Sequence, residues 1–206
     1  MTVPLQDSLR WTADGTTRLL QAMVTVRNDL DAASLLPNWS RRHVVAHVAA
    51  NAEALGNLVQ WATTGMRTPM YASPQERMAR IEQGTLLSPR ELEKWFDASA
   101  SALAEAWSLL DDDGWAHEVV TARGRPVPAT HIPWLRAREV WVHMVDLDVG
   151  QDFDGLPEDF LRALRSDVLA ARGAVPAVEA RLADEVAWLT GRPHTLVDAP
   201  ALPAWL

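Results

Sequence analysis

The sequence predicts a mainly α-helical protein built on a four-helix bundle. Apolar residues recur at helical spacing in four long segments, at about 4–30, 40–64, 88–110 and 132–147. By contrast, residues 115–130 are rich in β-branched and turn residues, and they predict a loop or a small hairpin around Arg123 and Gly124. A chain of 206 residues can bury a core without disulfides or a structural metal. We expect a helical bundle over residues 1–150 and a small C-terminal extension over 151–206.

The first two helices have recognisable boundaries. In the segment 4–30, Leu9, Met23, Val26 and Leu30 share one face, and the segment 35–39, which contains a proline, interrupts the pattern. Ser40 is a favourable N-cap for the second helix, and Gly65 is a favourable residue to end it. The side chain of His47 is then placed on a stripe beside the apolar face of the second helix.

The later helices are bounded in the same way. Residues 75–83 predict a short helix ending at Gly84, and Ser88 followed by Pro89 predicts the start of the third long helix, which stops at 111–114. The fourth long helix ends before Gly150. Two further helices are expected in the extension, at 156–172 and 176–189, and the tail 200–206 is too rich in proline to be helical.

Composition excludes several classes of protein. The chain has no cysteine, which excludes disulfides, zinc fingers, iron–sulfur clusters and cysteine nucleophiles. Its net charge of −8, without a cluster of Lys and Arg, argues against nucleic-acid binding. No apolar run approaches the ~20 residues of a membrane span, and the first ten residues do not resemble a signal peptide. We therefore expect a cytoplasmic protein with no membrane and no nucleic-acid partner.

The stretch around Glu139 and His143 carries the strongest chemical signal. These residues are four apart, so a helix places them on one face, and apolar residues surround them. A buried carboxylate is costly unless it is hydrogen-bonded, paired or bound to a metal. The spacing alone leaves open a structural hydrogen-bonded pair. With His47, the two residues would form a His/Glu/His triad with an open fourth position, typical of a catalytic zinc site, although nickel, cobalt and iron also accept these ligands.

The other polar candidates have two readings each. His43 lies one turn before His47 and is either a neighbour of the site or an exposed or backbone-bonded residue. Asp146 lies three residues after His143 and either orients that ring or is a surface charge. His117, His131 and His194 fall in expected loops, where no functional role is predicted for them. Trp39, Trp141 and Trp205 are expected to serve packing.

Several motifs, in order along the chain from about residue 35, resemble the mycothiol-dependent maleylpyruvate isomerase family, one of the DinB-like metal-binding bundles. The first is Leu36-Pro37-Asn38-Trp39-Ser40 with His43, His47 and Asn51. The second comprises Met70-Tyr71-Ala72-Ser73, Arg77 and Ile81-Glu82-Gln83-Gly84. The third is Arg138-Glu139 with His143, Asp146 and Leu147, and the last are Trp188-Leu189-Thr190-Gly191-Arg192 and Leu202-Pro203-Ala204-Trp205-Leu206.

The resemblance implies a chemistry for these residues. It makes His47, Glu139 and His143 the zinc ligands and mycothiol the thiol cofactor at the open position, where zinc would hold the thiol as thiolate. In the family's reaction, the thiolate adds to the cis double bond of maleylpyruvate, the resulting single bond rotates, and loss of the thiolate leaves fumarylpyruvate. A protein without cysteine must receive such a nucleophile from a cofactor. The expected partners are therefore a small thiol and a small dicarboxylate.

Arg77 and Arg192 lie in matching motifs and are the predicted catalytic cations, since arginine is suited to bidentate carboxylate binding. One departure concerns the C-terminus. The family usually has an α/β subdomain there, whereas residues 172–181 leave little room for strands, so the extension is predicted to be shortened and mostly helical. Alternative functions are a mycothiol S-transferase acting on another electrophile, a non-catalytic DinB-like binding module and, last, a zinc hydrolase.

Overall fold

The computed structural model describes residues 3–202 and 205, which fall into two compact units. One unit is Pro4–Val149, and the other holds the described residues from Gly150 onward together with Val3. Almost all regular structure in both units is helical. The predicted mainly α-helical fold is therefore confirmed.

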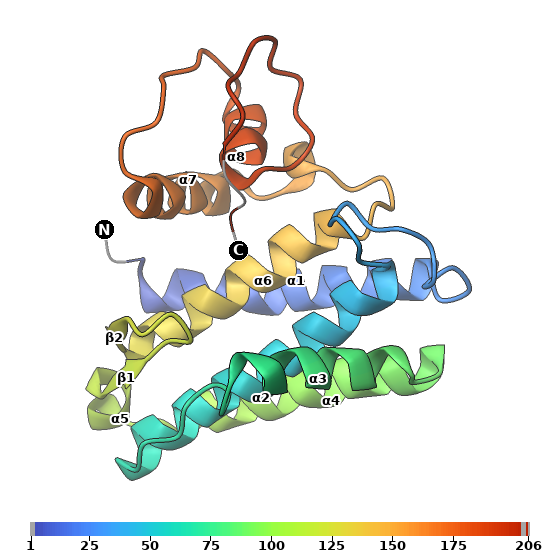
Figure 1. Ribbon diagram of the computed structural model, residues 1–206. Helices are drawn as coiled ribbons and strands as arrows, with labels where there is room; N and C mark the ends of the chain where they lie inside the picture. The colour runs from blue at the N-terminus through green and yellow to red at the C-terminus, as the bar shows by residue number, and fades with distance from the viewer. Residues whose placement is uncertain (1–2, 203–204, 206) are drawn as a thin grey trace. The chain divides into compact units, whose positions relative to one another are not determined.

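Four helices form the bundle of the first unit: α1 (Leu5–Thr25), α2 (Arg41–Thr64), α4 (Pro89–Ser108) and α6 (Ile132–Asp146). Helix α1 packs against α6, α6 against α2, α2 against α4, and α4 against α1, so the four helices close into a ring (Figure 1). A fifth helix, α3 (Pro74–Thr85), packs against α2. This arrangement sets α2 and α6 side by side, although they are far apart in the sequence.

Two predicted helix ends differ from the structure. Helix α1 stops at Thr25 rather than near residue 30, and Val26 and Leu30 are buried by the turns that follow the helix instead. Helix α3 continues through Gly84, where a Cβ atom would lie 2.5 Å from the Trp95 ring and 2.7 Å from the Cβ of Ala46. The glycine at position 84 thus permits close packing of α3 rather than ending it.

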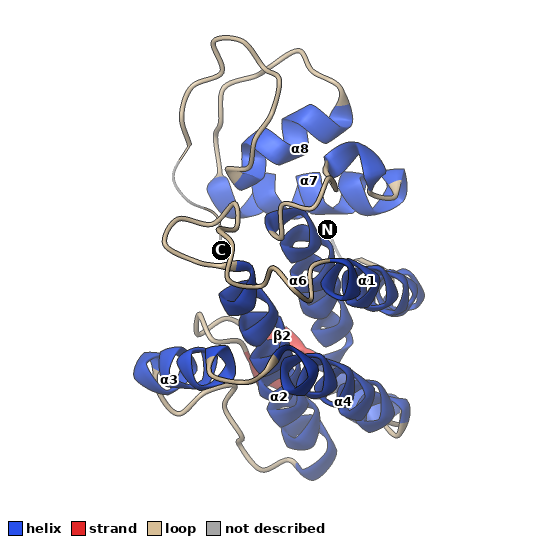
Figure 2. Cartoon of the chain, turned by 90° about the vertical axis from the view of Figure 1, so that its right-hand side faces the viewer, coloured by secondary structure: helices blue, strands red, loops and turns tan. Residues whose placement is uncertain are grey.

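The segment between α4 and α6 contains the predicted hairpin. Strands β1 (Glu118–Val120) and β2 (Pro126–Pro128) pair antiparallel with Val119 opposite Val127, on either side of the turn that contains Gly124 (Figure 1). Figure 2 shows β2 in red among the helices of the first unit. A short helix, α5 (Asp112–Ala116), precedes β1, and a 3-10 turn, η1 (Ala129–His131), leads into α6. The sequence analysis predicted only a helix stop at 111–114, but Asp111 caps α5 by accepting a hydrogen bond from the Gly114 N–H.

The core of the first unit is apolar and spans several elements. Buried side chains of α2, α4, α6, η1 and both strands form one cluster, which includes Val119 and Val127. Burial of this size is the main force holding the bundle together, at roughly 25 cal/mol per Å² of apolar surface. No helix within the described residues is long and apolar enough to cross a membrane.

The second unit contains a 3-10 turn, η2 (Phe153–Gly155), and two helices that pack together, α7 (Glu158–Arg172) and α8 (Leu182–Thr190). The prediction of a helix from 176 was wrong over its first residues, because the chain is irregular from 174 to 181. No strand occurs among the described residues after 149. Of the closing motif, Pro203, Ala204 and Leu206 lie outside the described residues.

Candidate metal centre

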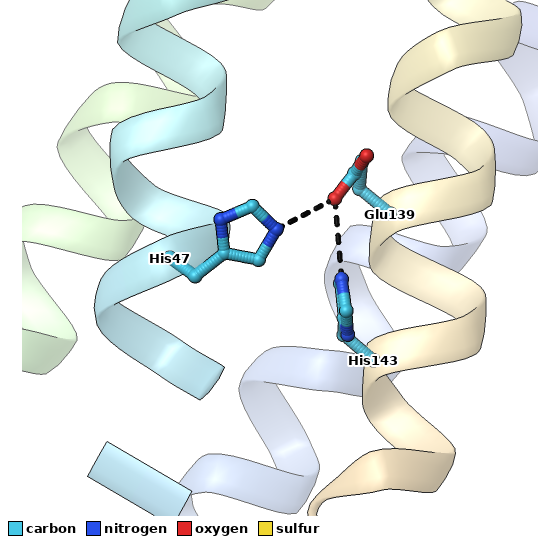
Figure 3. A group of neighbouring side chains, drawn as sticks. All are labelled: His47, Glu139 and His143. Atoms are coloured by element: carbon cyan, nitrogen blue, oxygen red, sulfur yellow. Dashed lines mark hydrogen bonds and ion pairs between the residues drawn. The ribbon is translucent and has the colours of Figure 1, made fainter. Parts of the chain in front are cut away.

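Three buried side chains from α2 and α6 meet inside the first unit. Glu139 and His143 lie one helical turn apart on α6, with Glu139 Oε2 3.2 Å from His143 Nε2. His47 projects from α2, and its Nε2 atom lies 2.9 Å from the same carboxylate oxygen (Figure 3). All three are almost inaccessible to solvent. The three side chains that the sequence singled out therefore face one another.

The donor set fits a divalent metal ion. One ligand atom from each of the three residues can be chosen so that all lie within 4.8 Å of one another. Two imidazoles and one carboxylate are the protein ligands of an open zinc site. If both rings bind as neutral ligands, a divalent ion there would keep one net positive charge. That charge favours an anion at the fourth position.

The orientation of His143 is the strongest indication of a metal ligand. Its Nδ1 atom lies 2.8 Å from Oδ2 of Asp146, a fully buried carboxylate that fixes the ring. Its Nε2 atom is buried and makes no hydrogen bond of acceptable geometry to the described residues, although the Glu139 carboxylate is close. When Nδ1 carries the proton, Nε2 presents a lone pair to the cluster, as in carboxylate–histidine–zinc sites. Of the two readings of Asp146, the structure supports the one that orients His143.

The charges of the three residues are coupled. Burial alone would raise the pKa of Glu139, but the close contact with the His143 ring and the hydrogen bond with His47 hold it well below its usual value. Burial lowers the pKa of His47 and keeps its ring neutral, with the Glu139 carboxylate only partly opposing this. Burial also disfavours charging of His143, yet the hydrogen bond to Asp146 and the nearby Glu139 raise its pKa. The carboxylates of Asp146 and Glu139 therefore favour the charged form of His143.

Helix α2 begins beside the site, and its first residues shape the surroundings of His47. His43 Nδ1 accepts a hydrogen bond from the Ser40 backbone N–H at 3.2 Å and lies 2.7 Å from Ser40 Oγ. The backbone-bonded reading of His43 is thus the one that the structure supports. The ring of Trp39 stacks on His43 and meets His47 edge-on, with the centroids of Trp39 and His47 5.5 Å apart. Trp39 therefore limits the rotation of the His47 ring.

Arg77, on α3, lies at the edge of the cluster. Its Nη2 atom is 3.5 Å from Nδ1 of His47, and it lies close enough to Tyr71 to lower the pKa of that residue. Burial raises the pKa of Tyr71 to about 12, with the negative charge of Glu139 acting in the same direction, so its hydroxyl stays neutral at physiological pH. In the sequence, Tyr71 stands out only as part of a motif, and its spacing does not predict a position near Arg77.

Arg136 is a second functional-site neighbour that the sequence analysis did not single out. It lies one turn before Glu139 on α6, is 1% exposed, and donates through Nη1 to the Val48 carbonyl and to Asn51 Oδ1. Burial lowers its pKa to about 10, so it remains charged at neutral pH. The i, i+3 spacing from Glu139 was the available signal.

The remaining candidates lie elsewhere. Arg192 belongs to the second unit, where it is 6% exposed and its Nη1 donates to the carbonyls of Thr190 and Trp205. His117, His131 and His194 lie outside the cluster, at the end of α5, in η1 and in the C-terminal loop. Trp141 donates from Nε1 to the Trp11 carbonyl in the core.

The chain is similar to one known protein family and to two solved structures. The model of the mycothiol maleylpyruvate isomerase N-terminal domain matches residues 9–148. A crystal structure of the mycothiol-dependent maleylpyruvate isomerase is 35% identical to the chain, with a TM-score of 0.89 over 100% of both chains. A histidine-to-alanine mutant of that enzyme is 34% identical, with a TM-score of 0.87 over 98% of this chain and 100% of the other. No curated protein is similar enough to count as a match. The chain belongs to the mycothiol maleylpyruvate isomerase family.

Proposed function

We propose that the protein is a zinc- and mycothiol-dependent cis–trans isomerase acting on maleylpyruvate or a closely related dicarboxylate. Its two solved relatives are described as mycothiol-dependent maleylpyruvate isomerases. The observation that carries the proposal is the buried cluster of His47, Glu139 and His143. When bound, zinc would lower the pKa of a coordinated thiol, and the thiol would supply the nucleophile that a chain without cysteine lacks.

In this proposal the residues of the chain have separate tasks. His47, Glu139 and His143 hold the ion, and Asp146 keeps the proton of His143 on Nδ1 so that Nε2 is free to bind. Two neutral rings and one carboxylate leave positive charge at the site, which favours an anionic sulfur over water. Burial of the three residues strengthens each of these interactions.

Arg77 is the proposed cation for a substrate carboxylate and for negative charge that develops on the substrate. It lies beside His47, and its remaining N–H groups can form a bidentate pair with a carboxylate. The neutral hydroxyl of Tyr71 would orient Arg77. Arg192 stays a proposed second cation, and two backbone carbonyls already accept hydrogen bonds from its Nη1. The cytoplasmic location expected from the sequence also stays a prediction.

The test is an isomerisation assay on protein of known metal content, with and without mycothiol. We expect turnover only when both zinc and mycothiol are present. The variant His47→Ala should lose zinc and turnover together, whereas His194→Ala, which removes an exposed histidine outside the cluster, should keep both. Turnover by metal-free His47→Ala protein would refute the mechanism.

The same assay separates the alternative activity. A mycothiol S-transferase would consume mycothiol with another electrophile and leave maleylpyruvate unchanged. A non-catalytic binding module would bind zinc without either activity. The buried cluster is compatible with all three, and the family relationship favours the isomerase.

A further inference from the structure

A cavity of about 310 Å³ lies in the first unit between α1 and α4, the two helices at the right of Figure 2. Its α1 wall consists of residues at positions i, i+3, i+4 and i+7, beginning with Leu9. Its α4 wall contains residues at the same spacing, beginning with Asp97. Because such positions share one helix face over about two turns, the cavity is a groove that runs along both helices.

Arg136 of α6 also lines this groove, and it lies at the inner end because its side chain is only 1% exposed. Among the described residues, Arg136 makes hydrogen bonds only through Nη1, which donates to the Val48 carbonyl at 2.6 Å and to Asn51 Oδ1 at 3.0 Å. The guanidinium carbon lies 5.9 Å from the centre of the Phe96 ring. The Nη2 atom is buried and has no hydrogen-bond partner in the part of the chain that the structure describes.

The unpartnered side of this guanidinium is the one suited to an anion. Its Nε and Nη2 groups form the edge through which arginine binds a carboxylate with two parallel hydrogen bonds. Leaving a buried charged donor without a partner costs free energy. The carboxylate of Glu139 is held by His47 and His143, and no ion pair joins it to Arg136. A carboxylate from a ligand would supply both the missing hydrogen bonds and the opposite charge.

The walls of the groove indicate the body of that ligand. Ala13, Ala100 and Ala104 leave space between the two helices, and Leu9 and Leu103 offer aliphatic surface. The volume lies at the lower end of the range of roughly 300–1,000 Å³ that is usual for small-molecule sites. A groove that extends along two helical turns therefore suits a short, extended hydrocarbon chain.

The mouth of the groove indicates how many charges the ligand carries. Asp97 lines the groove and is exposed, so a second carboxylate at the outer end would meet a like charge. We propose that the groove between α1 and α4 binds a short aliphatic monocarboxylate, whose carboxylate pairs with Arg136 and whose chain lies between the helices. This site is separate from the metal centre, and it does not depend on the isomerase activity proposed above.

The experiment titrates the full-length protein with hexanoate that carries a terminal trifluoromethyl group, and binding is followed by fluorine NMR. Unlabelled hexanoate, hexanamide and adipate then compete with this probe. Two variants alter the groove: Arg136→Gln removes the charge, and Ala104→Trp fills space at an exposed position. The control Ala102→Trp makes the same substitution on α4, at an exposed position that does not line the groove.

We expect the probe to bind with a Kd at or below about 1 mM and to be displaced by hexanoate. Hexanamide and adipate should compete at least about tenfold less well, because the amide lacks the charge and adipate brings a second carboxylate to Asp97. Arg136→Gln and Ala104→Trp should each weaken binding about tenfold or more, while Ala102→Trp stays within about twofold.

Three results would overturn the proposal: no saturable binding of the probe, competition by hexanamide or adipate as effective as by hexanoate, or equal binding by the Ala104→Trp and Ala102→Trp proteins. Equal binding by these two proteins would also be the result if the probe bound at the metal centre instead. If Arg136→Gln does not unfold cooperatively, the comparison of Ala104→Trp with Ala102→Trp decides, because both positions are exposed.

Discussion

Replacing Asp146 with asparagine tests how the ring of His143 is held. The carboxylate of Asp146 is fully buried and lies 2.8 Å from Nδ1 of His143, which leaves the lone pair at Nε2 for a metal. Asparagine has nearly the same shape but no charge, and its amide group can turn an N–H toward the ring. Removing such a partner typically costs 10–100-fold in metal affinity, or about 1.4–2.7 kcal/mol. We expect Asp146→Asn to bind zinc weaker by this factor.

The measurement is a zinc competition titration against a chromophoric chelator at neutral pH, together with thermal unfolding of the metal-free protein. Asp148→Asn is the matched control, because Asp148 is exposed two residues later and its left-handed backbone (φ 53°) suits asparagine. Its zinc affinity should be unchanged. If Asp146→Asn folds and binds zinc as tightly as the unaltered protein, the reasoning about the His143 tautomer is refuted.

Three further predictions concern pH, metal removal and packing. The pKa of His143 is raised above its ordinary value of 6.5, so zinc must displace a proton from this ring once the pH falls below the raised pKa. The apparent Kd for zinc should then rise about tenfold per pH unit, which calorimetric titrations across that pH range would measure. An apparent Kd that does not change with pH would show that His143 is not a ligand. Free zinc at about 100 times its Kd should stabilise the fold by about 2.7 kcal/mol, so removal of zinc by a chelator should lower Tm by roughly 5–10 °C. The chelator should not change the Tm of the His47→Ala variant. Gly84→Ala should destabilise the protein by about 1–3 kcal/mol in denaturant unfolding, because the added Cβ would clash with the Trp95 ring. Gly56→Ala should not destabilise it, because a Cβ at position 56 has no neighbour within 4 Å. Equal effects of the two substitutions would contradict the packing argument.

Spacing and apolar periodicity were sufficient to predict the main helices and to single out His47, Glu139 and His143 as candidates. The i, i+4 spacing of Glu139 and His143 sets their relative position within one helix, and the stripe of His47 on α2 places it beside the core. That α2 and α6 would be neighbours could not be read from spacing. The motif resemblance supplied that pairing, and their role as metal ligands stays a prediction.

Other features depended on contacts that a single sequence does not display. In the sequence, Gly84 indicates a helix end, but in the structure a glycine is needed at this position because the Trp95 ring packs against it. Val26 and Leu30 keep the apolar period of α1 although they lie in the turns after it, because burial does not require a helix. The place of Tyr71 near Glu139 arises from tertiary packing, which periodicity cannot give, whereas the place of Arg136 follows from its i, i+3 spacing on the same helix.

The two arms of the cluster are separated by 92 residues of chain, from His47 to Glu139. During synthesis the histidine of α2 therefore emerges well before the helix that completes the cluster, and the intervening segments are made in between. A nascent chain can offer an ion only one of the three side chains. Metal binding by all three side chains would thus require the complete bundle. A chain truncated before α6 would keep only His47 of the three.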